Sequence, residues 1–471
     1  MTWRAYRRTY GDEYGCGTGH GRRRQSTMAA DGGIARGRLS VAATAGAVSV
    51  LLVLTGCTSA TGNGPAGSPS AAGAPAGGAP ASAVPSSGPS SSGPATAQPQ
   101  PSASASASAT GVPPSPVVTP AASKAARTLA RMTLAQKVGQ LLMIGAPVEG
   151  IDANTPIDIS TYHVGNVYLK GRTYAGSVAA AAVVAQLKAQ VNAVSTAGVR
   201  QFVATDQEGG FVQVLNGPGF SAIPIALDQG GLDPAILRSN AKTWGSQLAG
   251  AGINVNLAPI LDTVPSDAVA TGNAPIGHYF REYGFTPESV ASHGIAFLKG
   301  MADAGVAAVP KHFPGLGRVS ANTDISTGVT DNQTIRNDPY IAPFLAAVTA
   351  GSRWMMVSSA LYPAIDAHHI APFSSVVLKD MLRKDLGFTG IIISDDLCSA
   401  VQLSPYAVEK RGADFIAAGG TMALCADAAM VPALHKGITR RAESDSTFAA
   451  AVDAAALKVL EVKAERHLLG R

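Results

Sequence analysis

Eight short apolar runs recur along the last 345 or so residues of the chain, separated by Ala-rich stretches of helical character. Each run is almost continuously apolar, which is typical of strands that are covered on both faces. Spacings of about 30 to 50 residues indicate parallel strands joined by crossover helices. The runs cover residues 141–145, 165–169, 201–205, 254–259, 307–310, 354–358, 390–394 and 420–424.

Polar residues follow four of these runs. They are Asp206, Asp262, the pair Lys311 and His312, and the pair Asp395 and Asp396. A barrel active site collects side chains from the carboxyl ends of several strands, whereas an open doubly wound sheet gathers ligands chiefly at one switch point. We therefore predict an α/β fold with a single (β/α)8 TIM-type barrel over residues 124–471.

The residues before this part have a different composition. From Thr58 to Ser123 there is no charged residue, and Ala, Ser, Gly, Pro and Thr dominate. Such a segment has too little large apolar surface to offset the entropy of ordering. We expect residues 57–123 to form a disordered linker.

The first 56 residues have the pattern of an export signal. Arg36 and Arg38 precede an apolar run over 39–54, which is short for a membrane span. The Leu-Thr-Gly-Cys sequence ending at Cys57 resembles a bacterial lipobox, which implies cleavage before Cys57 and lipidation of its sulfur. We expect a protein anchored by this lipid to the outer face of the cell membrane. An uncleaved signal anchor and a start at Met28 stay open.

Charge gives little reason to expect a nucleic-acid partner. The formal net charge is +5, but residues 1–56 hold eight Lys and Arg against three Asp and Glu, a net of +5 as well. Once that signal is removed, the chain is near neutral, so we predict no nucleic-acid binding.

The chain has four cysteines. Cys16 would leave with the signal, and Cys57 would be lipidated. Cys398 and Cys425 lie in apolar segments, and no Cys or His spacing indicates zinc. We expect both to be buried free thiols rather than a disulfide.

Three polar segments are candidates for chemistry. Asp395 and Asp396 end an apolar strand, where a carboxylate is costly unless it is used or paired. Helix capping fits Asp396 better, so Asp395 is the candidate nucleophile. Lys311 and His312 suit hydrogen bonding to sugar hydroxyls or a buried salt bridge. Asp206 begins a turn that contains two acids and two glycines. This turn fits either a ligand-binding site or a plain surface turn with solvated acids.

Together these segments resemble glycoside hydrolase family 3, in particular its single-domain β-N-acetylhexosaminidases. The resemblance covers nearly all of the predicted barrel and follows the family's order. It rests on residues 132–141, 206–210, 256–259 with Asp262, 311–315, 386–390 and 394–396. It implies a retaining β-glycosidase that needs no cofactor, with Asp395 as nucleophile and with Asp206, Arg281, Lys311 and His312 as ligands of a carbohydrate substrate.

The proton donor departs from the family pattern. The hexosaminidases have an Asp-Ser-His triplet after the Lys-His segment, whereas this chain has Asn322-Thr323-Asp324. Asp324 occupies the position of the histidine. An aspartic acid with a raised pKa can act as general acid and base, so Asp324 is our candidate, with a loop Asp bonded to its own backbone as the alternative.

The resemblance favours release of terminal β-N-acetylglucosamine from cell-wall-type glycans. Phe211 and Val214 stand where the family commonly has arginines, and Ser359 replaces a histidine, so substrate identity is less constrained than reaction class. A sugar-binding lipoprotein without turnover and a β-glucosidase stay open. The adjacent pair His368 and His369 lacks metal-ligand spacing, and we expect surface histidines and no metal site.

Overall fold

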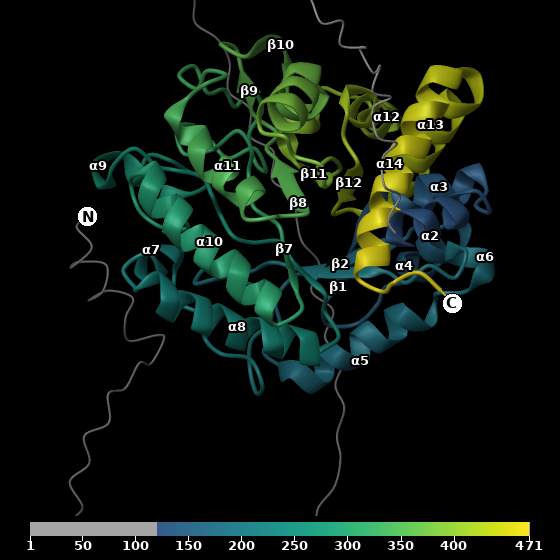
Figure 1. Ribbon diagram of the computed structural model, residues 1–471, viewed down its shortest axis with the longest axis horizontal. Helices are drawn as coiled ribbons and strands as arrows, with labels where there is room; N and C mark the ends of the chain where they lie inside the picture. The colour runs from purple at the N-terminus through teal and green to yellow at the C-terminus, as the bar shows by residue number, and fades with distance from the viewer. Residues whose placement is uncertain (1–119, 471) are drawn as a thin grey trace, which may run out of the picture. The chain divides into compact units, whose positions relative to one another are not determined.

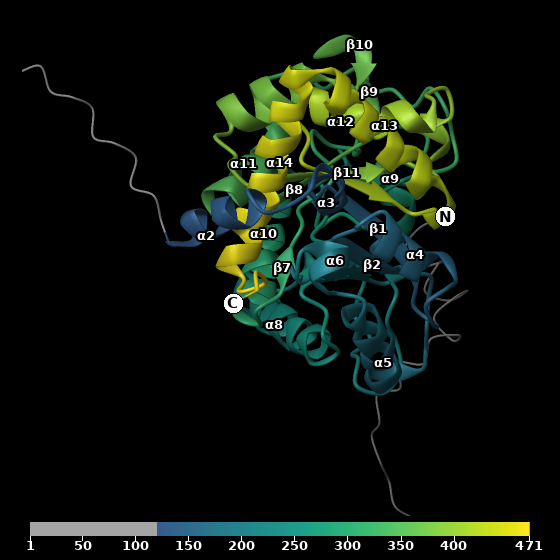
Figure 2. The ribbon, with the colours of Figure 1, turned by 90° about the vertical axis from the view of Figure 1, so that its right-hand side faces the viewer.

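The computed structural model describes residues 120–470, so the predicted export signal, Cys57 and most of the predicted linker lie outside the described residues. Helix α2 (Pro120–Leu129) begins within the residues assigned to the linker. It packs against α14 (Ser446–Glu465), so the two ends of the described chain lie together (Figure 2). Within residues 120–470, no helix is both long and apolar enough to cross a membrane.

Eight parallel strands form one ring in chain order, as the sequence predicted. They are β1 (Leu142–Pro147), β2 (Asn166–Lys170), β3 (Phe202–Thr205), β6 (Val255–Asn256), β7 (Ala307–Ala308), β8 (Trp354–Val357), β11 (Ile391–Asp396) and β12 (Met422–Cys425). Hydrogen-bonded neighbours run β7-β6-β3-β2-β1-β12-β11-β8. Just past β7, Phe313 N donates to Met356 O at 2.8 Å and Ser358 N donates to Phe313 O at 2.9 Å, which joins β7 to β8.

Helices surround the ring (Figure 1). They include α3 (Leu134–Gln140), α4 (Asn154–Thr161), α5 (Gly176–Ala189), α6 (Ala193–Thr196), α7 (Ala226–Gln229), α8 (Pro234–Gly250), α9 (Asp267–Ala270), α10 (Pro287–Asp303), α11 (Ala342–Thr349), α12 (Val408–Ala418), α13 (Val431–Ser444) and a π-helix, η4 (Val376–Asp385). Helices α8 and α10 pack side by side. Because helices cover the outside and side chains fill the inside, the strand residues are almost all buried.

Aromatic rings and one lysine lie at the amino ends of the strands. Phe202 and Trp354 meet edge to face with centroids 4.8 Å apart. The fully buried Lys463 donates to Gln140 Oε1 at 2.7 Å and to Gly165 O at 3.0 Å. This end of the barrel is therefore packed, and the polar strand ends identified in the sequence lie at the other, carboxyl end.

Candidate active site

A cavity of about 340 Å³ opens at the carboxyl ends of the strands. All six predicted catalytic and substrate-binding residues line it: Asp206, Arg281, Lys311, His312, Asp324 and Asp395. They come from the ends of β3, β7 and β11 and from the loops after β6 and β7. Because the strands close into a ring, residues more than 180 positions apart in the chain line the same cavity.

The two adjacent carboxyl groups at the end of β11 have different environments. Asp396 accepts three backbone N–H groups, from Cys398, Ser399 and Ala426, each at 2.9 Å. Burial raises the pKa of Asp396, and these hydrogen bonds oppose the rise. Asp395 lines the cavity and accepts Asp396 N at 2.9 Å on Oδ1, while its Oδ2 has no partner among the described residues. Asp396 also borders the cavity, but its backbone bonds fix the strand end, whereas Asp395 keeps one oxygen without a protein partner among the described residues.

A buried ion network forms one wall of the site. Lys311 Nζ lies 2.7 Å from Asp206 Oδ1 and 2.7 Å from Glu208 Oε1. Arg281 donates to both oxygens of Glu208, at 2.9 and 2.8 Å. Burial raises the pKa of Glu208, but Arg281 and Lys311 outweigh burial and lower it to about 2. The network holds Lys311 and Arg281 as fixed cations whose remaining N–H groups can donate to a ligand.

Glycines make the turn after Glu208 possible. Gly209 and Gly210 have φ of 114° and 55°, values that L side chains rarely adopt. A Cβ on Gly209 would lie 2.3 Å from Pro224 O. The turn joins β4 (Gln207–Gly209) to β5 (Val212–Gln213), and Asp206 and Glu208 flank Gln207.

His312 is held by a buried carboxylate. Its Nδ1 donates to Asp262 Oδ2 at 2.7 Å, and Asp262 also accepts Leu316 N at 2.7 Å. Asp262 is fully buried. An Nδ1 that donates to a carboxylate leaves Nε2 as the acceptor in the neutral ring, so His312 can accept from a sugar hydroxyl.

Asp324 lies at the mouth of the cavity. Asp324 is an exposed residue, but the surrounding protein atoms remove part of the water around its carboxyl group. This partial desolvation raises the pKa of Asp324, and the charge of Asp395 raises it further. His312, Arg281 and Lys311 oppose the rise. The predicted alternative, a carboxylate bonded to its own backbone, is not seen here: Asp324 N donates to the side chain of Asn322 at 2.9 Å.

Comparison with known proteins agrees with this geometry. Residues 133–462 match the family model "Glycosyl hydrolase family 3 N terminal domain". The chain belongs to glycoside hydrolase family 3. It is therefore a glycoside hydrolase with the barrel that the family resemblance implied.

Solved and curated family members resemble the chain over most of the barrel. The crystal structure of a β-N-acetylhexosaminidase from Beutenbergia cavernae matches with a TM-score of 0.70 and 47% identity, covering 71% of this chain and 99% of that one. A family 3 β-N-acetylglucosaminidase from Paenibacillus matches with a TM-score of 0.63 and 29% identity over 72% of this chain and 64% of that one. A β-hexosaminidase of Nitrosomonas eutropha is 31% identical over 276 residues, 57% of this chain and 75% of the relative.

Three residues of this family 3 site were not among the predicted site residues. Glu208 and Asp262 hold the predicted cations and His312, and both stood in segments already noted in the sequence. Tyr168 lies within β2 and lines the cavity. Burial, and then the charges of four surrounding carboxyl groups led by Asp396, raise its pKa well above the usual value. Tyr168 stands inside the predicted apolar run 165–169, so no signal in the sequence marked it as a site residue.

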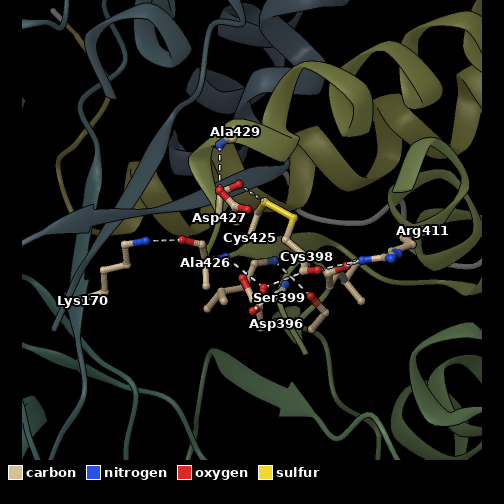
Figure 3. The surroundings of a disulfide bond; sticks show 12 residues. Lys170, Asp396, Cys398, Ser399, Arg411, Cys425, Ala426, Asp427 and Ala429 are labelled. Atoms are coloured by element: carbon tan, nitrogen blue, oxygen red, sulfur yellow. Dashed lines mark hydrogen bonds between the residues drawn. A yellow bond between two sulfur atoms is a disulfide. The ribbon is translucent and has the colours of Figure 1, made fainter. Parts of the chain in front are cut away.

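The expectation of free thiols at Cys398 and Cys425 is wrong. The two residues form a disulfide with Cα atoms 5.0 Å apart (Figure 3). Cys398 follows β11, and Cys425 is the last residue of β12; because these are neighbouring parallel strands, the two residues lie at the same end of the barrel. In this glycoside hydrolase the disulfide adjoins the loop that Asp396 caps, and it ties that loop to the end of β12.

His368 and His369 lie on the exposed strand β10 (Asp366–Ile370), which pairs with β9 (Leu361–Tyr362). His369 Nδ1 lies 3.1 Å from Asp366 Oδ2. Within residues 120–470, no three His, Cys, Asp or Glu side chains converge as metal ligands would.

Proposed function

We propose that the protein is a retaining exo-β-N-acetylhexosaminidase that releases terminal β-N-acetylglucosamine through a covalent glycosyl-enzyme on Asp395. One observation carries the proposal: Asp395 and Asp324 line one cavity and interact electrostatically, while the neighbouring Asp396, which also borders the cavity, accepts three backbone N–H groups. Retaining glycosidases require such a pair, one as nucleophile and the other as proton donor.

The first step forms the covalent intermediate. A carboxylate oxygen of Asp395 attacks the anomeric carbon and forms an ester bond to it. The bond between that carbon and the glycosidic oxygen breaks, its electron pair goes to the oxygen, and Asp324 gives its proton to that oxygen. The raised pKa of Asp324 supports this role, because a general acid must keep its proton at the working pH.

The second step releases the sugar. Asp324, now a carboxylate, takes a proton from a water molecule that attacks the anomeric carbon. The ester bond breaks, and its electron pair returns to Asp395. The loss of its proton in the first step thus prepares Asp324 as the base of the second.

The ion network supports recognition of sugar hydroxyls. Asp206 and His312 can accept from hydroxyl groups, and Lys311 and Arg281 can donate to them. Because these side chains already bond to each other, little side-chain entropy is lost when the sugar binds. The preference for an N-acetyl sugar is supported by the relatives, which carry the names β-hexosaminidase and β-N-acetylhexosaminidase.

We place the enzyme outside the cytoplasmic membrane, anchored by a lipid on Cys57 and acting on cell-wall-type glycans. The Cys398–Cys425 disulfide supports an oxidising compartment, since such bonds are rare in the cytosol. Globomycin, which blocks signal cleavage of lipoproteins, and mass spectrometry of the mature amino terminus test this. Cleavage elsewhere, or an unmodified Cys57, would refute the anchor.

The test of activity is release of nitrophenol from 4-nitrophenyl β-N-acetylglucosaminide, with Asp395→Ala as the inactive comparison. A panel of nitrophenyl β-glycosides distinguishes the N-acetyl sugar from glucose, and sugar binding by an inactive wild type would support the binding-protein alternative. A 5-fluoro-N-acetylglucosaminyl fluoride should trap the intermediate, with the label on Asp395. A label on another residue would disprove the proposed nucleophile.

A further inference from the structure

The candidate acid–base residue lies on an unusually long connection. Between β7 and the 3-10 helix η2 (Pro339–Ile341), residues 309–338 contain no helix or strand in the described chain. Loops of this length carry a large backbone entropy unless side chains anchor them, and they are often functional. Asp324 lies in this connection, so contacts with other parts of the barrel must hold it at the cavity that Asp395 lines.

The first part of the loop is held by two buried side chains, Asn273 from the loop after α9 and Tyr362 from β9. Asn273 Nδ2 donates to Leu316 O and Val319 O, both at 2.7 Å. Tyr362 Oη donates to Gly315 O at 2.8 Å. Both side chains are buried, so water does not compete well for these bonds. They fix the loop where it leaves the barrel, several residues before Asp324.

The part that carries Asp324 is held by the segment η5 (Val401–Leu403) after β11. Val401 N donates to Asp324 O at 3.1 Å, and Gln402 N donates to Thr323 O at 3.0 Å. The Gln402 side chain accepts Val329 N on Oε1 at 3.0 Å and donates from Nε2 to Val329 O at 3.2 Å. Gln402 is only 4% exposed. Its backbone and side chain therefore hold the loop on both sides of Asp324.

The same segment is joined to the nucleophile strand. Asp396 accepts the N–H groups of Cys398 and Ser399, and Cys398 is bonded to Cys425. The chain from Asp395 to Gln402 is thus fixed at its start by Asp396 and the disulfide and at its end by the Asp324 loop. A displacement of about 1 Å between reacting groups can cost on the order of 100-fold in rate.

We infer that Gln402 is a positioning residue for acid–base catalysis, which sets the place of Asp324 relative to Asp395. This inference rests on the proposed function. Gln402 touches neither substrate nor reacting atoms, so its role must appear in proton transfer and not in sugar binding.

The test uses leaving groups that differ in their need for a proton. Gln402→Met keeps the side-chain volume and removes both amide hydrogen bonds, whereas Gln402→Glu keeps the acceptor for Val329 N. For phenyl β-N-acetylglucosaminide, which needs protonation, we expect kcat/KM to fall about 10- to 100-fold in Gln402→Met, and no less in Gln402→Glu, whose buried carboxylate oxygen would face Val329 O. For the 2,4-dinitrophenyl glycoside, which needs none, we expect a fall below about threefold.

A matched control separates this effect from general instability. Gln136 is a buried glutamine on α3 at the opposite end of the barrel, where Nε2 donates to Ala193 O and Val194 O. Gln136→Met should change both substrates equally and slightly. Hydrogen–deuterium exchange of peptides covering 317–331 should become faster in Gln402→Met and stay unchanged in Gln136→Met.

Each outcome decides the inference. Equal losses of kcat/KM on both substrates, or unchanged exchange in the loop, would overturn the positioning role of Gln402. The proposed function would still be supported in that case if the wild type hydrolyses the dinitrophenyl glycoside and is labelled on Asp395. A wild-type protein that hydrolyses neither glycoside and takes no label would overturn both. Selective loss on the phenyl glycoside together with faster loop exchange would support the inference.

Discussion

Replacement of Glu208 by Gln tests whether the buried ion network determines the electrostatics of the site. Glu208 is only 4% exposed and accepts from Arg281 and Lys311. Its pKa of about 2, against 4.5 for an ordinary Glu, corresponds to about 3 kcal/mol, since one pKa unit is worth about 1.4 kcal/mol. Breaking a buried pair by removing one partner costs about 3–5 kcal/mol in general, which agrees. We expect Glu208→Gln to lower the free energy of unfolding at pH 7 by about 3 kcal/mol.

The pH dependence gives the sharper version of this test. A carboxyl group whose pKa is depressed on folding contributes stability above its unfolded pKa, and that contribution is lost as pH falls toward the folded value. The difference between wild type and Glu208→Gln should therefore be full above pH 4.5 and shrink as pH falls toward 2. Urea unfolding followed by circular dichroism at pH 7, 5, 4 and 3 measures it.

An exposed ion pair provides the control. Arg336 and Asp385 form a bidentate pair at 2.6 and 2.9 Å on the surface. Surface pairs contribute little, so Asp385→Asn should change stability far less than Glu208→Gln. If the two variants lose the same stability, or if the loss in Glu208→Gln does not depend on pH, the reasoning about the buried network is wrong.

Three further predictions address other parts of the molecule. Removing the disulfide with Cys398→Ser and Cys425→Ser should lower the free energy of unfolding by about 3–4 kcal/mol in urea, because it closes a loop of 27 residues; an unchanged midpoint would contradict this. Burial raises the pKa of Glu282 to about 7, so the folded state favours its protonated form and wild-type stability should fall as pH rises from 4.5 to 7. Glu282→Gln should make thermal unfolding less dependent on pH over this range. Because Asp324 must be protonated to act as acid, kcat/KM for a phenyl glycoside should fall as pH rises through its raised pKa, and Asp324→Ala should abolish that alkaline limb.

The strands could be predicted from sequence because parallel strands covered on both faces are continuous apolar runs. The two largest deviations have a local cause. The runs 254–259 and 307–310 form ladders of only two residues each, β6 and β7. Pro259 and Pro310 lack the N–H group that would extend the ladders.

The connections between side chains could not be predicted in the same way. The pairing of Cys398 with Cys425 depends on β11 and β12 being neighbours in space. The pairing of Glu208 with Arg281 joins β4 to the loop after β6, and their 73-residue separation carries no periodic signal. Sequence patterns identify which residues end strands, whereas the closed ring decides which of these residues meet.

The division of roles among neighbouring carboxyl groups follows from their partners rather than from their residue type. Glu208 lies between two cations, which hold it ionised, and Asp396 is saturated by three N–H groups. Asp324 has no such partner for its carboxyl group among the described residues, and burial and the charge of Asp395 outweigh the opposing effects of His312, Arg281 and Lys311 on its pKa. One fold can thus give neighbouring carboxyl groups different environments, and the raised pKa of Asp324 fits the proton donor that a two-step displacement at one carbon requires.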